Sequence, residues 1–159
     1  MTTPPSTTVQ MTTTTTVQIT TTATTIEDCP AGWSKNGTSC YWIVEYDMDW
    51  LAAQDVCNQL SPGAHLASSG SAVENDYLRN LYTYSSHLYI WLGATDSSEE
   101  GTWAWTDGTA FNYTNWYSGE GSDGSNHNCL AMDVNSYPGK WFDQGCFDSN
   151  WCICEIDLA

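Results

Sequence analysis

The side chains best suited to binding chemistry lie in one stretch, from Asn115 to Glu155. Its first part carries carboxylate and hydroxyl oxygens on Glu120, Ser122 and Asp123. Calcium is bound in proteins by about six to eight oxygen ligands of these kinds, so the stretch offers candidate cation ligands. The part between Cys129 and Cys146 has almost no helical period and many Gly, Ser, Asn and Asp residues. Such a loop cannot hold itself together by apolar burial, so we expect a disulfide or a bound cation to stabilise it.

The first element expected to position this stretch is a helix that begins after Asp49, a favourable N-cap residue. Trp50, Ala53, Cys57 and Leu60 recur at helical spacing, which places them on one face. That face turns Cys57 inward, as a structural disulfide requires. The Ser-Pro-Gly sequence after Leu60 ends the helix.

A second helix is predicted to begin at Ser71, which forms a capping-box pair with Glu74. Its packing side chains are expected to be Val73, Tyr77, Leu78 and Leu81. A hairpin is expected near the start of the domain, with its turn at Asn36-Gly37. Extended segments are expected at residues 41–45, 89–94 and 151–155. Two helices against antiparallel strands, with a long excursion between Gly108 and Lys140, predict an α+β fold.

The charge of the chain restricts its partners. Nineteen acidic residues face only three basic ones, Lys35, Arg79 and Lys140, which gives a net charge of −16. This charge argues against nucleic acid and anionic membranes, and it favours cations and cationic partners, although a solvated acidic surface explains most of it. The chain has no apolar run of the roughly 18 residues that a membrane span needs, so we expect no membrane insertion.

Seven cysteines indicate an oxidising, extracellular setting, with the protein secreted or stalked at the cell surface. Residues 1–28 are rich in Thr, which predicts a disordered and O-glycosylated stalk, or a passive linker, ahead of one domain at 29–159. No export signal is visible, so we interpret the sequence as a processed or truncated piece of a longer chain. Asn36 and Asn112 begin Asn-x-Thr sequons, and Asn36 is the better candidate because it lies in a turn.

From Cys29 to Glu155 the sequence resembles a C-type lectin-like domain, in the long form with an N-terminal disulfide hairpin. The resemblance rests on marks that stand in family order: Cys29-Pro30 with Trp33, Cys40-Tyr41, Cys57, His65-Leu66-Ala67, Trp91-Leu92-Gly93-Ala94, Trp103-x-Trp105-x-Asp107-Gly108, Asn115-Trp116, Cys129, Trp141-x-Asp143, Cys146 and Cys154-Glu155. It implies two helices packed on small antiparallel sheets, with a long irregular loop region and disulfide staples. It also implies recognition rather than catalysis.

The resemblance and the order of the chain give the same disulfide pairing, which spacing alone does not select: Cys29–Cys40, Cys57–Cys154 and Cys129–Cys146. Cys152 is left over. In an extended strand it points to the same face as Cys154, so it competes for Cys57. We favour a buried free thiol, and the alternative is a dimer bridged through Cys152.

In the family, one calcium ion forms the sugar site, and its ligand positions are occupied here by Glu120, Ser122, His127, Phe142 and Asp143. Only the first and last keep the family's carboxylates. Gly121 stands in place of proline, and the phenyl ring of Phe142 offers calcium no oxygen. The resemblance therefore implies a degraded or atypical sugar site.

The family has a second calcium site, which supports the loop, and its ligand positions are better preserved here than those of the sugar site. Its ligand positions carry Asp96, Glu100, Asp123 and Asn128, all with side-chain oxygens, so a structural calcium ion is the expected cofactor. The competing interpretation is that these are solvated loop residues. Among the aromatic residues, we expect Trp91, Trp103, Trp105 and Trp141 to be core, and we expect Tyr117, Tyr137 and Phe142 to be exposed.

Exposed rings stack on sugars and also anchor protein interfaces. Two functions follow: a carbohydrate-binding module that takes glycans, and a calcium-independent protein-binding or structural domain whose partner is a cell-surface or extracellular protein. Mineral or ice binding is a third. His65, His87 and His127 lack the spacing of a metal or catalytic motif, and His65 is interpreted as a partly exposed strand residue, so an enzyme is not predicted.

Overall fold

The structure is a computed structural model that describes residues 28–82, 87–122, 124 and 126–158. Nearly all of the predicted Thr-rich stalk, and the predicted calcium ligand Asp123, lie outside the described residues. Among the described residues, no helix is long and apolar enough to cross a membrane.

In the described part of the chain, eight strands form one connected sheet: β1 (Ser34–Asn36), β2 (Ser39–Met48), β3 (His65–Leu66), β4 (Tyr89–Thr95), β5 (Ala104–Trp105), β6 (Cys129–Asp133), β7 (Trp141–Gln144) and β8 (Asn150–Asp157). The order along the main path is β1-β2-β8-β4-β6-β7, with β3 paired to β8 and β5 paired to β4. The pair β4–β8 is parallel and the other pairs are antiparallel. The predicted α+β class is confirmed, with the small sheets joined through β4 and β8.

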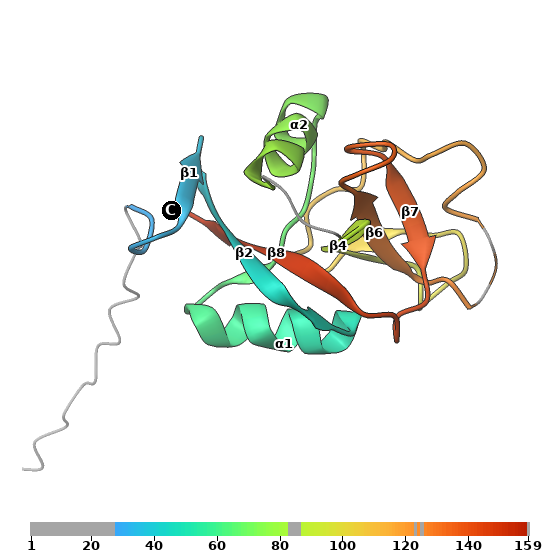
Figure 1. Cartoon of the computed structure of the whole chain (residues 1–159), viewed down its shortest axis with the longest axis horizontal. Helices are drawn as coiled ribbons and strands as arrows, with labels where there is room; N and C mark the ends of the chain where they lie inside the picture. The colour runs from blue at the N-terminus through green and yellow to red at the C-terminus, as the bar shows by residue number, and fades with distance from the viewer. Residues whose placement is uncertain (1–27, 83–86, 123, 125, 159) are drawn as a thin grey trace, which may run out of the picture.

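Helix α1 (Trp50–Leu60) and helix α2 (Ala72–Leu81) lie on opposite sides of β2 and β8 (Figure 1). Asp49 caps α1 as predicted, because its carboxylate accepts a hydrogen bond of 2.8 Å from the Ala52 N–H. The buried face contains Trp50, Ala53 and Cys57. Leu60 is 46 % exposed, so its prediction as a core residue was wrong; the helix ends there, beyond the edge of the packed face.

Ser71 caps α2 as predicted, with its hydroxyl accepting a bond of 3.2 Å from the Glu74 N–H. The Glu74 carboxylate in turn accepts from the N–H of Gly70 at 2.7 Å. Val73 is 79 % exposed, so the prediction that it packs was wrong. Asn75 is buried instead, and its side chain reaches the loop region.

The four tryptophans expected in the core are buried: Trp91, Trp103, Trp105 and Trp141. They divide between two apolar clusters. Trp141 belongs to the cluster that also holds Leu78 and Ile153, and Trp91 belongs to the one that also holds Cys57. The aromatic residues therefore supply the bulk of a core that has few long aliphatic runs.

The three predicted disulfides are present: Cys29–Cys40, Cys57–Cys154 and Cys129–Cys146. Cys152 is a free thiol with no exposed surface, which agrees with the favoured interpretation. Burial raises the pKa of this thiol to about 12, so it stays protonated at neutral pH. Its burial does not fit a disulfide to a second chain.

The two predicted glycosylation sites differ in exposure. Asn36 ends β1 and is half-buried, whereas Asn112 lies in the long loop and is exposed. Exposure therefore favours Asn112, opposite to the sequence-based ranking.

Candidate functional site

The loop region is fixed against β7 by backbone hydrogen bonds. The N–H of Tyr117 donates to the carbonyl of Trp141 at 2.9 Å, and the N–H of Trp141 donates to the carbonyl of Asn115 at 3.0 Å. These bonds lay residues 115–117 alongside β7 as an added extended segment. β7 also pairs with β6 on its other edge.

Trp141 is the centre on which the loop packs. Its ring lies 5.5–5.7 Å from the rings of Trp105, Tyr113 and Trp116, each in an edge-to-face arrangement. Its indole N–H donates to the Asn75 side chain at 2.7 Å, which ties the loop to α2. Ring packing therefore replaces regular secondary structure as the source of order in this region.

Four other rings form a group on the opposite face of β7, which we call the tyrosine cluster: Tyr89, Tyr117, Tyr137 and Phe142. Phe142 lies at its centre, stacked on Tyr117 at 5.1 Å and tilted against Tyr89 at 5.2 Å. Phe142 is only 8 % exposed, so the prediction of an exposed ring was wrong; three tyrosines cover it. Tyr137 is 48 % exposed and Tyr117 is half-buried, so these two present the cluster to solvent.

Two tyrosines of the cluster, Tyr89 and Tyr117, have raised pKa values. A hydrogen bond with Tyr137 raises the pKa of Tyr117, and the charge of Glu120 adds to the shift. Burial raises the pKa of Tyr89, with further contributions from Asp133 and Glu120. The cluster thus combines ring faces, phenol hydroxyls and one adjacent carboxylate. Such a surface can stack on an apolar face and hydrogen-bond to a hydroxyl group.

The remaining residues of the predicted sugar site do not converge on this cluster. Asp143 is 2 % exposed, and strand alternation places it on the other face of β7 from Phe142. Ser122 and His127 are exposed loop residues, and the N–H of His127 bonds to the carbonyl of Gly124 at 3.1 Å. Their exposure and strand positions thus set Ser122, His127 and Asp143 apart from the ring cluster.

Gly121 explains why the family proline is absent. Its φ of 85° is closed to proline, and an added Cβ would lie 2.7 Å from the ring of Trp116. Its carbonyl accepts a bond of 2.9 Å from the indole N–H of Trp103. The backbone thus passes directly over the tryptophans at this point.

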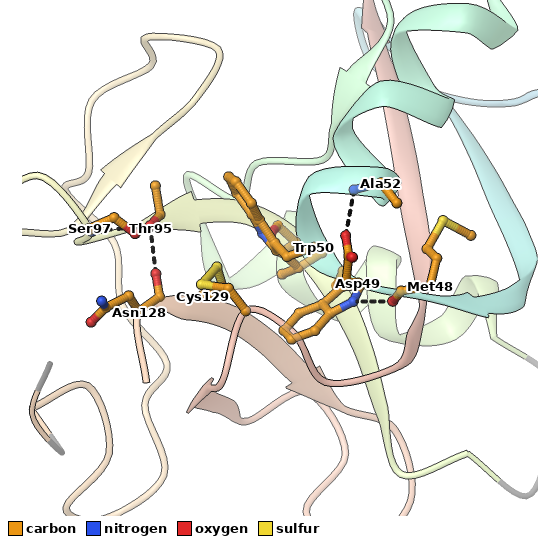
Figure 2. The surroundings of a disulfide bond; sticks show 11 residues. Met48, Asp49, Trp50, Ala52, Thr95, Ser97, Asn128 and Cys129 are labelled. Carbon is orange, nitrogen blue, oxygen red and sulfur yellow. Dashed lines mark hydrogen bonds between the residues drawn. A yellow bond between two sulfur atoms is a disulfide. The ribbon is translucent and has the colours of Figure 1, made fainter. Parts of the chain in front are cut away.

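Three of the four residues predicted to bind a structural calcium ion, Asp96, Glu100 and Asn128, lie among the described residues. Asp96 is 2 % exposed; its Oδ2 accepts from the Gly101 N–H at 2.8 Å, and its Oδ1 is buried without a hydrogen-bond partner. The Asp96 N–H donates to the carbonyl of Asn128 at 3.3 Å, and Thr95 Oγ1 donates to the same carbonyl at 2.6 Å. Figure 2 shows Asn128 and Thr95 joined in this way beside Cys129.

These contacts bring two of the predicted ligands, Asp96 and Asn128, to one place. Glu100 is exposed in the turn that follows Asp96. A buried carboxylate oxygen without a donor is costly unless a cation or water satisfies it, so the residues fit an oxygen-ligated cation. Sequence reasoning missed Tyr89 as a site residue; the only available signal was its place at the start of an expected strand.

Comparisons with known proteins agree with this architecture. The model of the lectin C-type domain matches residues 46–156. The C-type lectin lectoxin-Enh5 of Pseudoferania polylepis is 35 % identical over 138 residues, which cover 83 % of this chain and 85 % of that protein.

Two solved structures are also similar. A calcium-independent type II antifreeze protein superposes with a TM-score of 0.75 at 30 % identity, covering 83 % of this chain and 96 % of its own. The cow carbohydrate-recognition domain of CD23, in the presence of a GlcNAc2Man3 oligosaccharide, gives a TM-score of 0.73 at 29 % identity, covering 84 % and 98 %. The chain belongs to the C-type lectin domain family.

Proposed function

We propose that this domain recognises glycans through the tyrosine cluster rather than through a sugar-ligating calcium ion. The observation that carries the proposal is the stack of Phe142 on Tyr117, with Tyr137 exposed beside it. Phe142 stands where the family pattern has an amide ligand, so ring faces replace metal coordination at this position. The lectin relatives and the glycan in the CD23 structure support a carbohydrate partner.

A sugar would bind with its apolar face on Tyr137 and Tyr117. The carboxylate of Glu120 would accept from sugar hydroxyl groups near the rim, and the tyrosine hydroxyls would donate or accept. Such a site holds its ligand by stacking and a few hydrogen bonds, so its affinity falls below that of a metal-centred site.

Calcium keeps a structural role in this proposal. Asp96, Asn128, Glu100 and Asp123 would supply oxygens to one ion that holds residues 95–101 against the segment before Cys129. The orphaned Oδ1 of Asp96 supports this assignment. The ion would order the loop that carries Glu120 without touching the sugar.

The proposed setting is extracellular. Three disulfides, the Thr-rich residues 1–28 as a glycosylated stalk, and sequons at Asn36 and Asn112 are consistent with a secreted or stalked glycoprotein. Residues 29–159 form the recognition domain in this arrangement. No enzymatic activity is proposed.

A second candidate function is protein recognition by the same cluster. The packing of Phe142 against Tyr89 and Tyr117 favours protein recognition, because clustered aromatic side chains also form the anchors of protein interfaces. The calcium-independent antifreeze protein among the similar structures shows that this fold also serves without the ion.

A glycan array separates the two candidates. The protein is applied in calcium and again in chelator, with the same glycans. We expect binding to one class of glycan in both conditions, somewhat weaker in chelator because the loop loses its ion. Binding only in calcium would point to a sugar-ligating ion, and no binding in either condition would favour the protein partner.

A further inference from the structure

A second group of possible metal ligands lies away from the loop, where three segments meet. β3 pairs with β8 so that His65 stands directly opposite Glu155, which places both side chains on one face of the sheet. Asp107 joins them from the turn after β5. One ligand atom from each residue lies within 4.8 Å of the other two.

Asp107 is the most informative of the three. Its side chain is only 4 % exposed, and its Oδ2 is buried without a hydrogen-bond partner, 4.0 Å from His65 Nδ1. Its other oxygen accepts from the N–H and the hydroxyl of Thr109 at 2.7 and 2.8 Å. One oxygen is therefore held in place while the other points into the group with nothing to bind.

Glu155 is equally constrained. It is 2 % exposed, and its Oε2 accepts from the N–H of Ser68 at 3.0 Å. Burial, which removes the carboxylate from water, raises the pKa of Glu155 to about 6. Asp157 adds a further carboxylate 3.7 Å from His65 Nε2, and its side chain is 60 % exposed.

In the described part of the chain, the charged side chains around His65 are acidic, and no lysine or arginine contacts them. The three lysine and arginine residues of the chain make their polar contacts elsewhere: Lys35 with Asp28, Arg79 with Asn80 and Lys140 with Asn115. Three carboxylates thus surround one imidazole. A divalent cation would neutralise them and would give the orphaned oxygen of Asp107 a partner.

We propose that His65, Asp107 and Glu155 form a binding site for a divalent transition-metal ion of the zinc class, with Asp157 or water as the fourth ligand. One imidazole nitrogen with carboxylate oxygens is a set that zinc accepts, whereas calcium takes oxygen ligands only. Zinc bonds of about 2.0–2.2 Å need the ligand atoms to move inward by less than about 1 Å. The bonds from Thr109 and Ser68 orient the two buried carboxylates, as partners behind metal ligands commonly do. The exposed side chain of Asp157 marks the path of entry.

Titration calorimetry with zinc chloride tests the proposal on the disulfide-intact chain after chelator treatment. We expect one saturable site per chain, at least tenfold weaker in His65→Gln and in Asp107→Asn. Asp107→Asn keeps the oxygen that binds Thr109, so it is expected to fold with an unchanged or higher melting temperature in chelator. His87→Gln and Cys152→Ala are matched controls, because they remove another imidazole and the free thiol.

Each result bears on the site directly. A zinc-induced rise in melting temperature that disappears in both ligand variants, and remains in both controls, supports it. Absence of saturable binding, or binding of unchanged affinity in His65→Gln, would overturn it. Loss of binding in a control variant alone would place the ion elsewhere and would also overturn it. Calcium in place of zinc should produce no heat that depends on His65.

Discussion

The two halves of this molecule gain their order in different ways. The framework half, made of α1, β2, β3 and β8, follows regular periodicity and is closed by Cys57–Cys154 across 97 residues. The loop half, residues 95–146, has short strands and is organised by rings around Trp141 and by Cys129–Cys146 across 17 residues. A recognition surface can thus be rebuilt in the loop half, where ring packing sets the structure, while the framework stays fixed.

Replacing Trp141 with alanine is expected to have the largest effect. The side chain is fully buried, and its loss should lower the free energy of unfolding by about 3–5 kcal/mol. The buried Asn75 oxygen would also lose its donor, at a further cost of about 1–3 kcal/mol. Urea denaturation measures this loss. If the free energy of unfolding fell only as much as it does for a surface substitution, the loop half would have no core of its own. The contrast between the two halves would then fail.

The disulfides Cys57–Cys154 and Cys129–Cys146 should differ in their contribution to stability. Loop-closure entropy predicts a cost of about 4–5 kcal/mol for a double alanine replacement of Cys57 and Cys154, and about 3 kcal/mol for Cys129 and Cys146. Both variants are compared by denaturation under non-reducing conditions, with Cys152→Ala as background to prevent re-pairing. Equal losses would contradict the view that loop-closure entropy sets the contribution of each disulfide.

Phe142→Ala is expected to cost about 3 kcal/mol, because it opens a cavity under Tyr89, Tyr117 and Tyr137. Phe142→Leu, which keeps most of the volume, should cost less than half as much. Thermal unfolding in chelator measures both. A loss below about 0.5 kcal/mol for the alanine variant would show that the ring is solvent-facing and that the tyrosine cluster is not formed.

The smallest expected effect concerns the structural ion. Calcium at about 100 times its dissociation constant should stabilise the wild type by about 2.7 kcal/mol and should not stabilise Asp96→Asn. In chelator the variant should match or exceed the wild type, since it buries a neutral amide in place of a carboxylate whose Oδ1 lacks a partner. Glu99→Gln serves as the control at an exposed neighbouring carboxylate. Equal calcium responses in wild type and Asp96→Asn would remove this residue from the site.

Local chemistry predicted where both helices begin. Asp49 and Ser71 are N-caps because a short oxygen side chain reaches the free N–H groups of the first turn, and this depends only on neighbours in sequence. Leu60 and Val73 were mispredicted because periodicity assigns a face to a helix but not the extent of the partner that covers it. The pairing of the cysteines came from the family pattern rather than from spacing.

The candidate sites depended on contacts between distant segments. Phe142 is buried by Tyr117 and Tyr89, which come from other parts of the chain. Its neighbours in sequence do not show this contact, so the sequence predicted an exposed ring. His65 has no metal motif around it in sequence, because its partners Asp107 and Glu155 come from the turn after β5 and from β8. Asp96 and Asn128 were predicted as calcium ligands from the family pattern, and the structure brings them together through the bond from the Asp96 N–H to the Asn128 carbonyl.

The most direct test of the account compares wild type, Tyr137→Ala and Tyr46→Ala on one glycan array in chelator. Tyr46 is a matched control, an exposed tyrosine on β2 outside the loop half. The account predicts that wild type and Tyr46→Ala bind the same glycans without calcium and that Tyr137→Ala loses at least tenfold in affinity. Equal binding by all three proteins, or binding that appears only when calcium is restored, would contradict recognition through the tyrosine cluster.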